Sequence, residues 1–185
     1  MQTLLRLADL LDAFIDRFGR IAAWSSLALV LLMAFNVLLR YFFRTGSVGL
    51  QEMEWHIMAF LSLTCMAYTT LKDGHVQVDI LYVRFSDRVK RIITFISCTL
   101  ILIVAAILLK LSVPYVMQSY TIGESSPDPG GLSNRWIVKS LLIVGFALLV
   151  VQSLSAWLRA LVALLTGGVA DNQTDGGHGG VTHAA

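Results

Sequence analysis

The sequence predicts an all-α polytopic membrane protein with four transmembrane helices plus interfacial amphipathic helices. Of its 185 residues 56% are hydrophobic and 14% are charged, and its mean hydropathy is +0.72. Soluble domains carry about 25% charged residues, which argues against a soluble enzyme, a nucleic-acid-binding protein or a disordered chain. Four stretches of 17 to 19 residues contain no Asp, Glu, Lys or Arg: residues 21–39, 55–71, 92–109 and 140–158. At about 1.5 Å per residue, each covers most or all of a hydrocarbon core of about 30 Å.

The first expected element is an amphipathic helix over residues 3–19, lying in the membrane interface or against a partner. At 100° per residue its apolar side chains share one face and its charges share the other. The apolar face holds Leu4, Leu7, Leu11, Phe14 and Phe18, and the polar face holds Arg6, Asp9, Asp12, Asp16 and Arg17. Charges placed among the leucines do not fit a cleavable signal peptide. We expect the chain to turn inward at Arg20 and to cross the membrane over residues 20–43.

The second span is expected over residues 53–72, and an amphipathic segment over residues 78–91 follows it. The leucine, phenylalanine and valine of that segment share one face, and its arginines share the other. These arginines are expected to reach lipid phosphates or a partner: Arg84, Arg88 and Arg91.

The third span is expected over residues 91–120 with a kink at Pro114, and the fourth over residues 136–160. Between them, residues 123–135 form a polar loop rich in serine, proline, aspartate and glycine. Tryptophans at span ends are expected to anchor the protein at the interface: Trp55, Trp136 and Trp157. Residues 1–166 thus form one membrane domain, and the glycine-rich tail 167–185 is expected to be disordered.

Lysine and arginine residues are distributed unevenly between the two sides of the membrane. With a cytoplasmic N-terminus, nine of the 14 lie on the cytoplasmic side and five lie outside. The positive-inside rule therefore predicts cytoplasmic N- and C-termini and an outward-facing loop 123–135.

The span interiors offer little chemistry. They contain no ionisable side chain at their centres, whereas proteins that conduct ions or protons usually keep one there. Cys65 and Cys98 lie far apart within spans and are expected to be small packing residues, and His56 has no second histidine for a haem. No metalloprotease, P-loop, nucleophile-elbow or dinucleotide-binding motif is present. We therefore expect neither an enzyme nor a cofactor.

Polar residues cluster instead at the span ends, where each has a structural and a partner-binding interpretation. His75 and Asp79, four residues apart, either pair locally or contact a partner subunit. Glu52 and Glu54 either cap the second span or pair with an arginine or a partner. Arg40 either extends to lipid phosphate or takes part in such a pair.

The loop between the third and fourth spans is either a solvated turn or a docking surface. Its proline and glycine residues favour a fixed shape, because proline restricts φ and glycine permits tight turning. The candidate contact residues in this loop and just after it are Glu124, Asp128, Arg135 and Lys139.

Four motifs in this order resemble the small membrane (Q-type, four-helix) subunit of a tripartite ATP-independent periplasmic (TRAP) transporter. They are NVLLRYF at residues 36–42, LQEMEWH at 50–56, DGHVQVD at 73–79, and ESSPDPGGL at 124–132 with Trp136 and Lys139 after it. The resemblance covers residues 4–165.

This resemblance implies a non-catalytic subunit of the bacterial cytoplasmic (inner) membrane. Its implied partners are a large multispanning permease subunit, which moves the solute by a sodium-coupled motion, and a periplasmic solute-binding protein. Organic acids or related anions are the implied solutes, sodium is expected to act in the large subunit, and this chain is expected to hold that subunit in the lipid bilayer. A self-sufficient small oligomeric transporter and the membrane anchor of an electron-transfer enzyme remain as alternatives.

Overall fold

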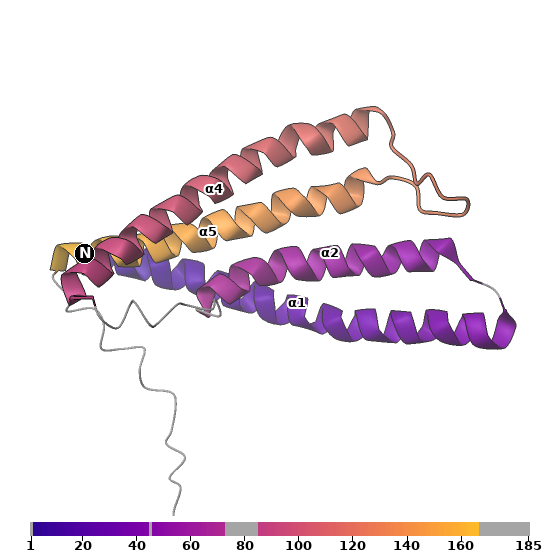
Figure 1. Cartoon of the computed structure of the whole chain (residues 1–185), viewed down its shortest axis with the longest axis horizontal. Helices are drawn as coiled ribbons and strands as arrows, with labels where there is room; N and C mark the ends of the chain where they lie inside the picture. Colours follow the sequence, from indigo (N-terminus) through magenta and orange to yellow (C-terminus); the bar gives the residue numbers. More distant parts are fainter. Residues whose placement is uncertain (1, 45, 73–84, 167–185) are drawn as a thin grey trace, which may run out of the picture.

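The computed structural model describes residues 2–44, 46–72 and 85–166, and these residues form an all-helical fold (Figure 1). The helices are α1 (Gln2–Phe43), α2 (Val48–Leu71), α4 (Asp87–Thr121) and α5 (Trp136–Thr166). The predicted all-α fold is confirmed. The first half of the segment 78–91 and the tail 167–185 lie outside the described residues, and so do three candidate residues: His75, Asp79 and Arg84.

Three of these helices, α1, α4 and α5, are long and apolar enough to cross a membrane by their length and composition. This agrees with a polytopic membrane protein. Helix α2 is 24 residues long, but it carries two acids near its start and three threonines in its second half. Its role as a fourth span stays a prediction.

The helices form an open layer with α5 at its centre (Figure 1). Toward the right of the view they follow one another in the order α4, α5, α2 and α1, while at the left α1 passes beside α5. Helix α5 contacts all three others, and α4 packs chiefly on α5. Ile15, Ala67 and Leu148 from three different helices form the buried centre. Because the layer is open, α1 and α4 leave most of their apolar side chains exposed.

Helix α1 is continuous from Gln2 to Phe43, so the predicted turn at Arg20 is wrong and residues 3–19 do not form a separate helix. The physical reason is a seam of side chains at alternating spacings of three and four residues, none of which is exposed. This spacing keeps one face of a long helix against its neighbours. The seam consists of Ala8, Leu11, Ile15, Phe18, Ala22, Ser25, Leu29, Leu32, Asn36 and Leu39. The alternating spacing of three and four residues continues unchanged on both sides of Arg20. Whether residues 3–19 lie in the membrane interface stays a prediction.

Helix α4 has a seam of the same kind, and the helix passes without a break through residue 91, where the predicted interfacial segment meets the third span. The point at which this helix enters the membrane stays a prediction. The helix begins at Asp87 after the N-cap Ser86, so Arg88 and Arg91 belong to its first turns. The seam consists of Arg91, Phe95, Cys98, Leu102, Ala105, Leu109, Ser112, Val116 and Ser119. From Cys98 onward, every second residue of this seam is small, which permits close packing on α5. Pro114 lies within α4 without ending it.

Two glycines allow the other helices to approach closely. A Cβ atom on Gly145 of α5 would lie 2.7 Å from Cβ of Leu63 on α2, and one on Gly19 of α1 would overlap the ring of Tyr68 on α2. Each of these two positions therefore favours glycine, because a side chain there would clash with α2. They fix how α2 lies between α1 and α5.

Candidate interface at the hairpin end

Charged residues mark the two ends of the helix layer. The hairpin end holds the connection between α1 and α2 and the loop 122–135, and the terminal end holds the start of α1 and the end of α5. On each helix, one charge at each end borders the charge-free run, 18 to 20 residues or about 27 to 30 Å apart. The pairs are Arg20 and Arg40, Glu54 and Lys72, Arg91 and Lys110, and Lys139 and Arg159. Their separation matches the thickness of a hydrocarbon core.

Glu52 holds the loop 122–135 onto α2. Its side chain comes from the second turn of α2, since the helix begins at Val48 after the N-cap Ser47, and it is 3% exposed. One carboxylate oxygen accepts a hydrogen bond from Ser126 Oγ and the other accepts one from Leu132 N at 2.5 Å. The interpretation of Glu52 as a helix cap is therefore wrong, because the helix starts five residues earlier than expected.

The loop has a defined internal geometry around this carboxylate. Ser126 N donates to Leu132 O at 3.2 Å, and Gly131 N donates to Asp128 O at 3.0 Å. A Cβ atom on Gly131 would lie 2.6 Å from Cβ of Ser126 and 3.0 Å from the Glu52 carboxylate. Gly130 has φ +81°, a conformation that favours glycine. The loop is therefore a fixed structure rather than a loose turn.

Glu124 anchors the other side of the loop. Its carboxylate accepts hydrogen bonds from Ser119 Oγ of α4 at 2.7 Å and from Lys139 Nζ of α5. Lys139 Nζ also lies 4.5 Å from the ring centre of Tyr115. The bond from Lys139, and then the one from Ser119, lowers the pKa of Glu124. The bonds from Ser126 and from Leu132 N lower the pKa of Glu52.

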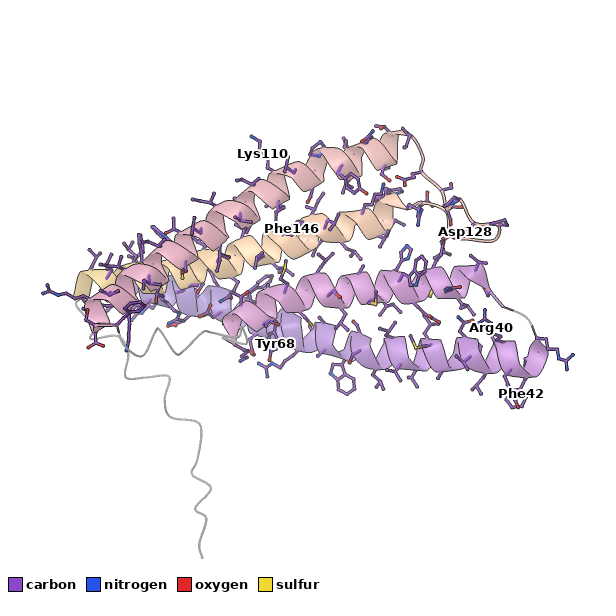
Figure 2. All side chains as sticks on the ribbon, in the orientation of Figure 1. Arg40, Phe42, Tyr68, Lys110, Asp128 and Phe146 are labelled. Atoms are coloured by element: carbon purple, nitrogen blue, oxygen red, sulfur yellow. The ribbon has the colours of Figure 1, made fainter. Side chains whose placement is uncertain are left out.

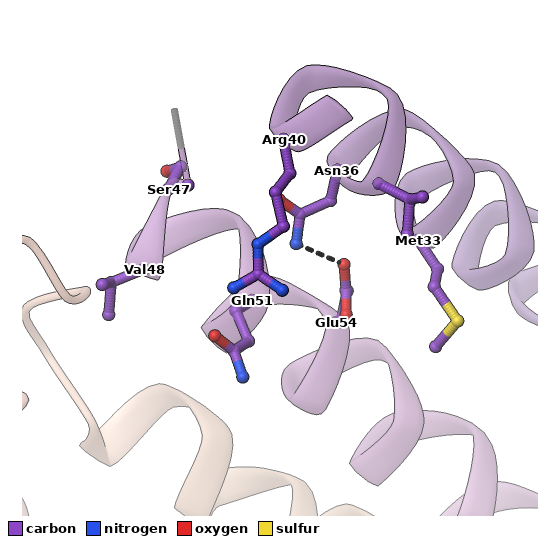
Figure 3. Close-up of a pocket in the computed structure, with 9 residues that line it drawn as sticks. Met33, Asn36, Arg40, Ser47, Val48, Gln51 and Glu54 are labelled. Carbon is purple, nitrogen blue, oxygen red and sulfur yellow. Dashed lines mark hydrogen bonds between the residues drawn. The ribbon is translucent and has the colours of Figure 1, made fainter. Parts of the chain in front are cut away.

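Glu54 lies two residues after Glu52 and faces α1 rather than the loop. It accepts a hydrogen bond from Asn36 Nδ2 at 2.9 Å. Its side chain, with that of Arg40, lines a cavity between the end of α1 and the start of α2 (Figure 3). Because Glu54 lies in the second turn of α2, the cap interpretation is wrong for it as well.

The remaining candidates at this end lie around the loop. Asp128 is exposed on the loop (Figure 2). Arg135 is half-buried, and its backbone N donates to Glu124 O at 2.9 Å. Trp136 packs edge-on against Tyr120, with ring centres 5.4 Å apart. Trp55 on α2 is 51% exposed.

At the terminal end the structure shows a cluster that the sequence interpretation missed. Asp12 of α1 accepts hydrogen bonds from Ser155 Oγ at 2.6 Å and from Arg159 of α5 at 2.6 and 3.1 Å. Arg159 also donates to Asp9 at 2.6 Å, and Asp16 forms an ion pair with Lys72 at 2.8 Å. The sequence signal was the run of acids on α1, but their partners lie as many as 150 residues away.

Of the predicted interface residues on this side, Trp157 is half-buried and bonds within the protein. Its Nε1 donates to Thr99 Oγ1 of α4 at 3.0 Å, and its ring lies 5.7 Å from that of Phe95. Arg88 is exposed and Arg91 is half-buried in the α4 seam.

These arrangements consist of contacts that join elements of the structure to one another. Within residues 2–44, 46–72 and 85–166, no group of three or more His, Cys, Asp or Glu side chains could hold a metal ion. The strongest polar contacts join one helix to another or to the loop. These contacts hold the helices in a fixed arrangement that has charged, hydrogen-bonding groups at its two ends.

Comparison with known proteins gives the same result as the motifs. Residues 29–163 match the family model described as "Tripartite ATP-independent periplasmic transporters, DctQ component". The "C4-dicarboxylate TRAP transporter small permease protein DctQ" of Pseudomonas aeruginosa is 30% identical over 133 residues, which cover 68% of this chain. The match spans 63% of that relative's length. The chain belongs to the family of DctQ components of the tripartite ATP-independent periplasmic transporters.

Proposed function

We propose that this chain is the small permease subunit of a sodium-coupled secondary transporter that works with a periplasmic solute-binding protein. In this proposal it lies in the bacterial inner membrane and holds the large permease subunit in place. The observation that carries the proposal is the distribution of charge: each helix has a stretch of about 27 to 30 Å without charge between the two charged residues that border it. A helix interior without ionisable groups suits bracing better than conduction.

Two further features support the scaffold role. The open layer leaves the apolar side chains of α1 and α4 uncovered over most of their length, which provides surface for both lipid and a large membrane partner. The polar contacts at both ends tie α1, α2 and α5 together, so the layer can resist movement of a neighbour. Because the relative's name mentions C4-dicarboxylates, we propose small organic acids as the solutes, recognised by the partners.

The function is tested by reconstitution. We expect the chain to co-purify with a large multispanning permease, and labelled C4-dicarboxylate uptake to require this chain, the permease, the binding protein and an inward sodium gradient. Each component is omitted in turn, and the chain alone is the control for a self-sufficient transporter. Full uptake by the permease and the binding protein without this chain would refute the scaffold role. Uptake by this chain alone would favour the self-sufficient transporter.

The orientation is tested separately by introducing one cysteine at a time and labelling it with a membrane-impermeant maleimide in spheroplasts. Ser133 at the hairpin end and Thr3 at the terminal end are both exposed. We expect Ser133→Cys to react in intact spheroplasts and Thr3→Cys to react only after permeabilisation. The parent chain, whose half-buried Cys65 and Cys98 remain, gives the background. The reverse labelling pattern contradicts cytoplasmic termini.

A further inference from the structure

The cavity between the end of α1 and the start of α2 has a volume of about 330 Å³ and combines opposite charges with an apolar wall (Figure 3). Arg40 and Asn36 come from α1, and Gln51 and Glu54 come from α2. Met33 and Val37, about two turns and one turn before Arg40 on α1, provide the apolar part of the lining. The cavity is open on one side.

The two charges in this cavity do not form an ion pair with each other. Glu54 accepts a hydrogen bond from Asn36 Nδ2 through one carboxylate oxygen. No ion pair within 4.0 Å joins Arg40 to a carboxylate in the described part of the chain. Figure 3 shows the Arg40 guanidinium directed into the space between the two helices, near Gln51 and Glu54. The cavity therefore presents one cation and one anion to whatever enters it.

The position of the cavity along the helices narrows the choice of ligand. Arg40 is the first charge after the charge-free run 21–39, and Glu54 is the last before the run 55–71. Met33 and Val37 lie on the apolar side of this boundary, and the exposed aromatic residues Tyr41 and Phe42 lie just beyond Arg40. A ligand that fills the cavity must pair with both charges while its tail meets apolar side chains.

We propose that this cavity binds the headgroup of a zwitterionic phospholipid with a primary ammonium group, as in phosphatidylethanolamine. The phosphate pairs with the planar guanidinium of Arg40, which suits phosphate geometry. The ammonium donates to Glu54 and Gln51, and an acyl chain lies along Met33 and Val37. A single charged side chain from a protein partner would leave one of the two charges without a counterpart, whereas this headgroup supplies both.

The test is lipid retention by the full-length chain, measured by native mass spectrometry after incubation with phosphatidylethanolamine, phosphatidylcholine or phosphatidylglycerol of identical acyl chains. We expect phosphatidylethanolamine to be retained about tenfold more than the other two, because only its headgroup makes charge-assisted bonds to both residues. Glu54→Gln is expected to bring the ethanolamine and choline lipids to equal retention. Arg40→Gln is expected to reduce retention of all three about tenfold.

Two matched variants serve as controls. Lys110→Gln removes the charge that ends the charge-free run of α4, and Asp87→Asn removes an exposed acid from the first turn of α4. Both lie outside the cavity, so both are expected to retain lipid as the unaltered chain does. If Arg40→Gln does not fold, the ethanolamine-to-choline ratio of Glu54→Gln decides the question alone.

Three results would overturn the proposal. Equal retention of the three lipids by the unaltered chain would show no headgroup selection, and an equal loss in Arg40→Gln and Lys110→Gln would show diffuse attraction. The third is unchanged lipid retention in Arg40→Gln combined with a reduced yield of the complex with the large permease, which would make the cavity a protein contact. The lipid measurement needs no transport partner, so it is independent of the proposed function.

Discussion

Replacing Glu52 by glutamine is expected to release the loop 122–135 from α2. The carboxylate accepts from two donors, Ser126 Oγ and Leu132 N, whereas a glutamine amide has one accepting oxygen and would direct an N–H₂ group at the second donor. Losing a hydrogen bond to a charged group costs about 1.5–3 kcal/mol. At about 2 kcal/mol, the population of the open loop rises about 30-fold.

Amide hydrogen exchange measures this opening directly. The N–H groups of Ser126, Gly131, Leu132 and Arg135 all donate within the closed arrangement, so exchange across residues 124–135 reports its population. Glu54→Gln is the matched control, because Glu54 lies in the same turns of α2 and bonds to Asn36 of α1 instead. Equal protection of the loop in the two variants would contradict the role of Glu52.

The same contact makes the loop sensitive to acid. Hydrogen bonds hold the pKa of Glu52 and of Glu124 below their usual values, so both carboxylates stabilise the closed loop at any pH above the usual value of about 4.3. This stabilisation is lost as the pH falls through the lowered pKa of each group. After correction for intrinsic exchange rates, we expect the loop to stay protected down to about pH 4.3 and to open at lower pH. In Glu52→Gln the acid-dependent part is smaller, since Glu124 alone contributes.

The features of the fold that depend on local composition could be predicted from the sequence. The charge-free runs give the all-α membrane fold, and the order of the polar motifs gives the family. Element boundaries were harder, because amphipathicity at 100° per residue describes one helix in isolation. Leu4, Leu7 and Phe14, the apolar face expected to meet the membrane interface or a partner, are all exposed and do not pack within the protein. The face that packs on α5 and α2 follows the seam from Ala8 to Leu39 instead.

The residues of the candidate site could also be predicted from the sequence only in part. Glu52, Glu54 and Glu124 stood out as acids at the ends of apolar runs, but their partners could not be read from neighbouring positions. Ser126 and Leu132 are 74 and 80 residues from Glu52, and Asp12 is 147 residues from Arg159. Only the arrangement of the helices brings these groups together. Trp157 looked like an interface anchor for a similar reason, since its partner Thr99 lies on another helix.

Replacing Asp12 by leucine is expected to detach the first half of α1 from α5. The change removes the acceptor of Gln152 Nε2; Gln152 is 3% exposed. It also removes one of two acceptors of the fully buried Ser155, which keeps Ala8 O, and one of two carboxylates bonded to Arg159, which keeps Asp9. Gln152 Oε1 already lacks a partner among the described residues, so the whole amide would then be buried without a hydrogen bond. Leaving a buried polar group without a partner costs about 1–3 kcal/mol. The pair with Arg159, whose side chain is 43% exposed, adds about 1 kcal/mol or less.

Hydrogen exchange over residues 2–18, together with thermal unfolding in detergent, measures the effect. Asp9→Asn is the control, since Asp9 is largely exposed and makes one contact with the same guanidinium; an exposed pair contributes about 0–1 kcal/mol. The second half of α1 is expected to stay on α2 in both variants, because Asn36 still bonds to Glu54. Normal protection of residues 2–18 in Asp12→Leu would mean that apolar packing around Ile15 holds this segment without the cluster.

The double variant Asp12→Leu with Arg159→Leu separates charge from packing. If the cost of Asp12→Leu arises from the lost pair with the guanidinium of Arg159, removing the guanidinium as well should restore part of the stability, because an apolar pair can replace an ion pair at little cost. If the cost arises from Ser155 and Gln152, the double variant should be no more stable than the single one. The coupling between the two substitutions therefore shows how much the Asp12–Arg159 pair holds the first half of α1 against α5. A double variant that is clearly more stable than the two single costs add up to would identify this pair as a bond that holds the segment in the helix layer.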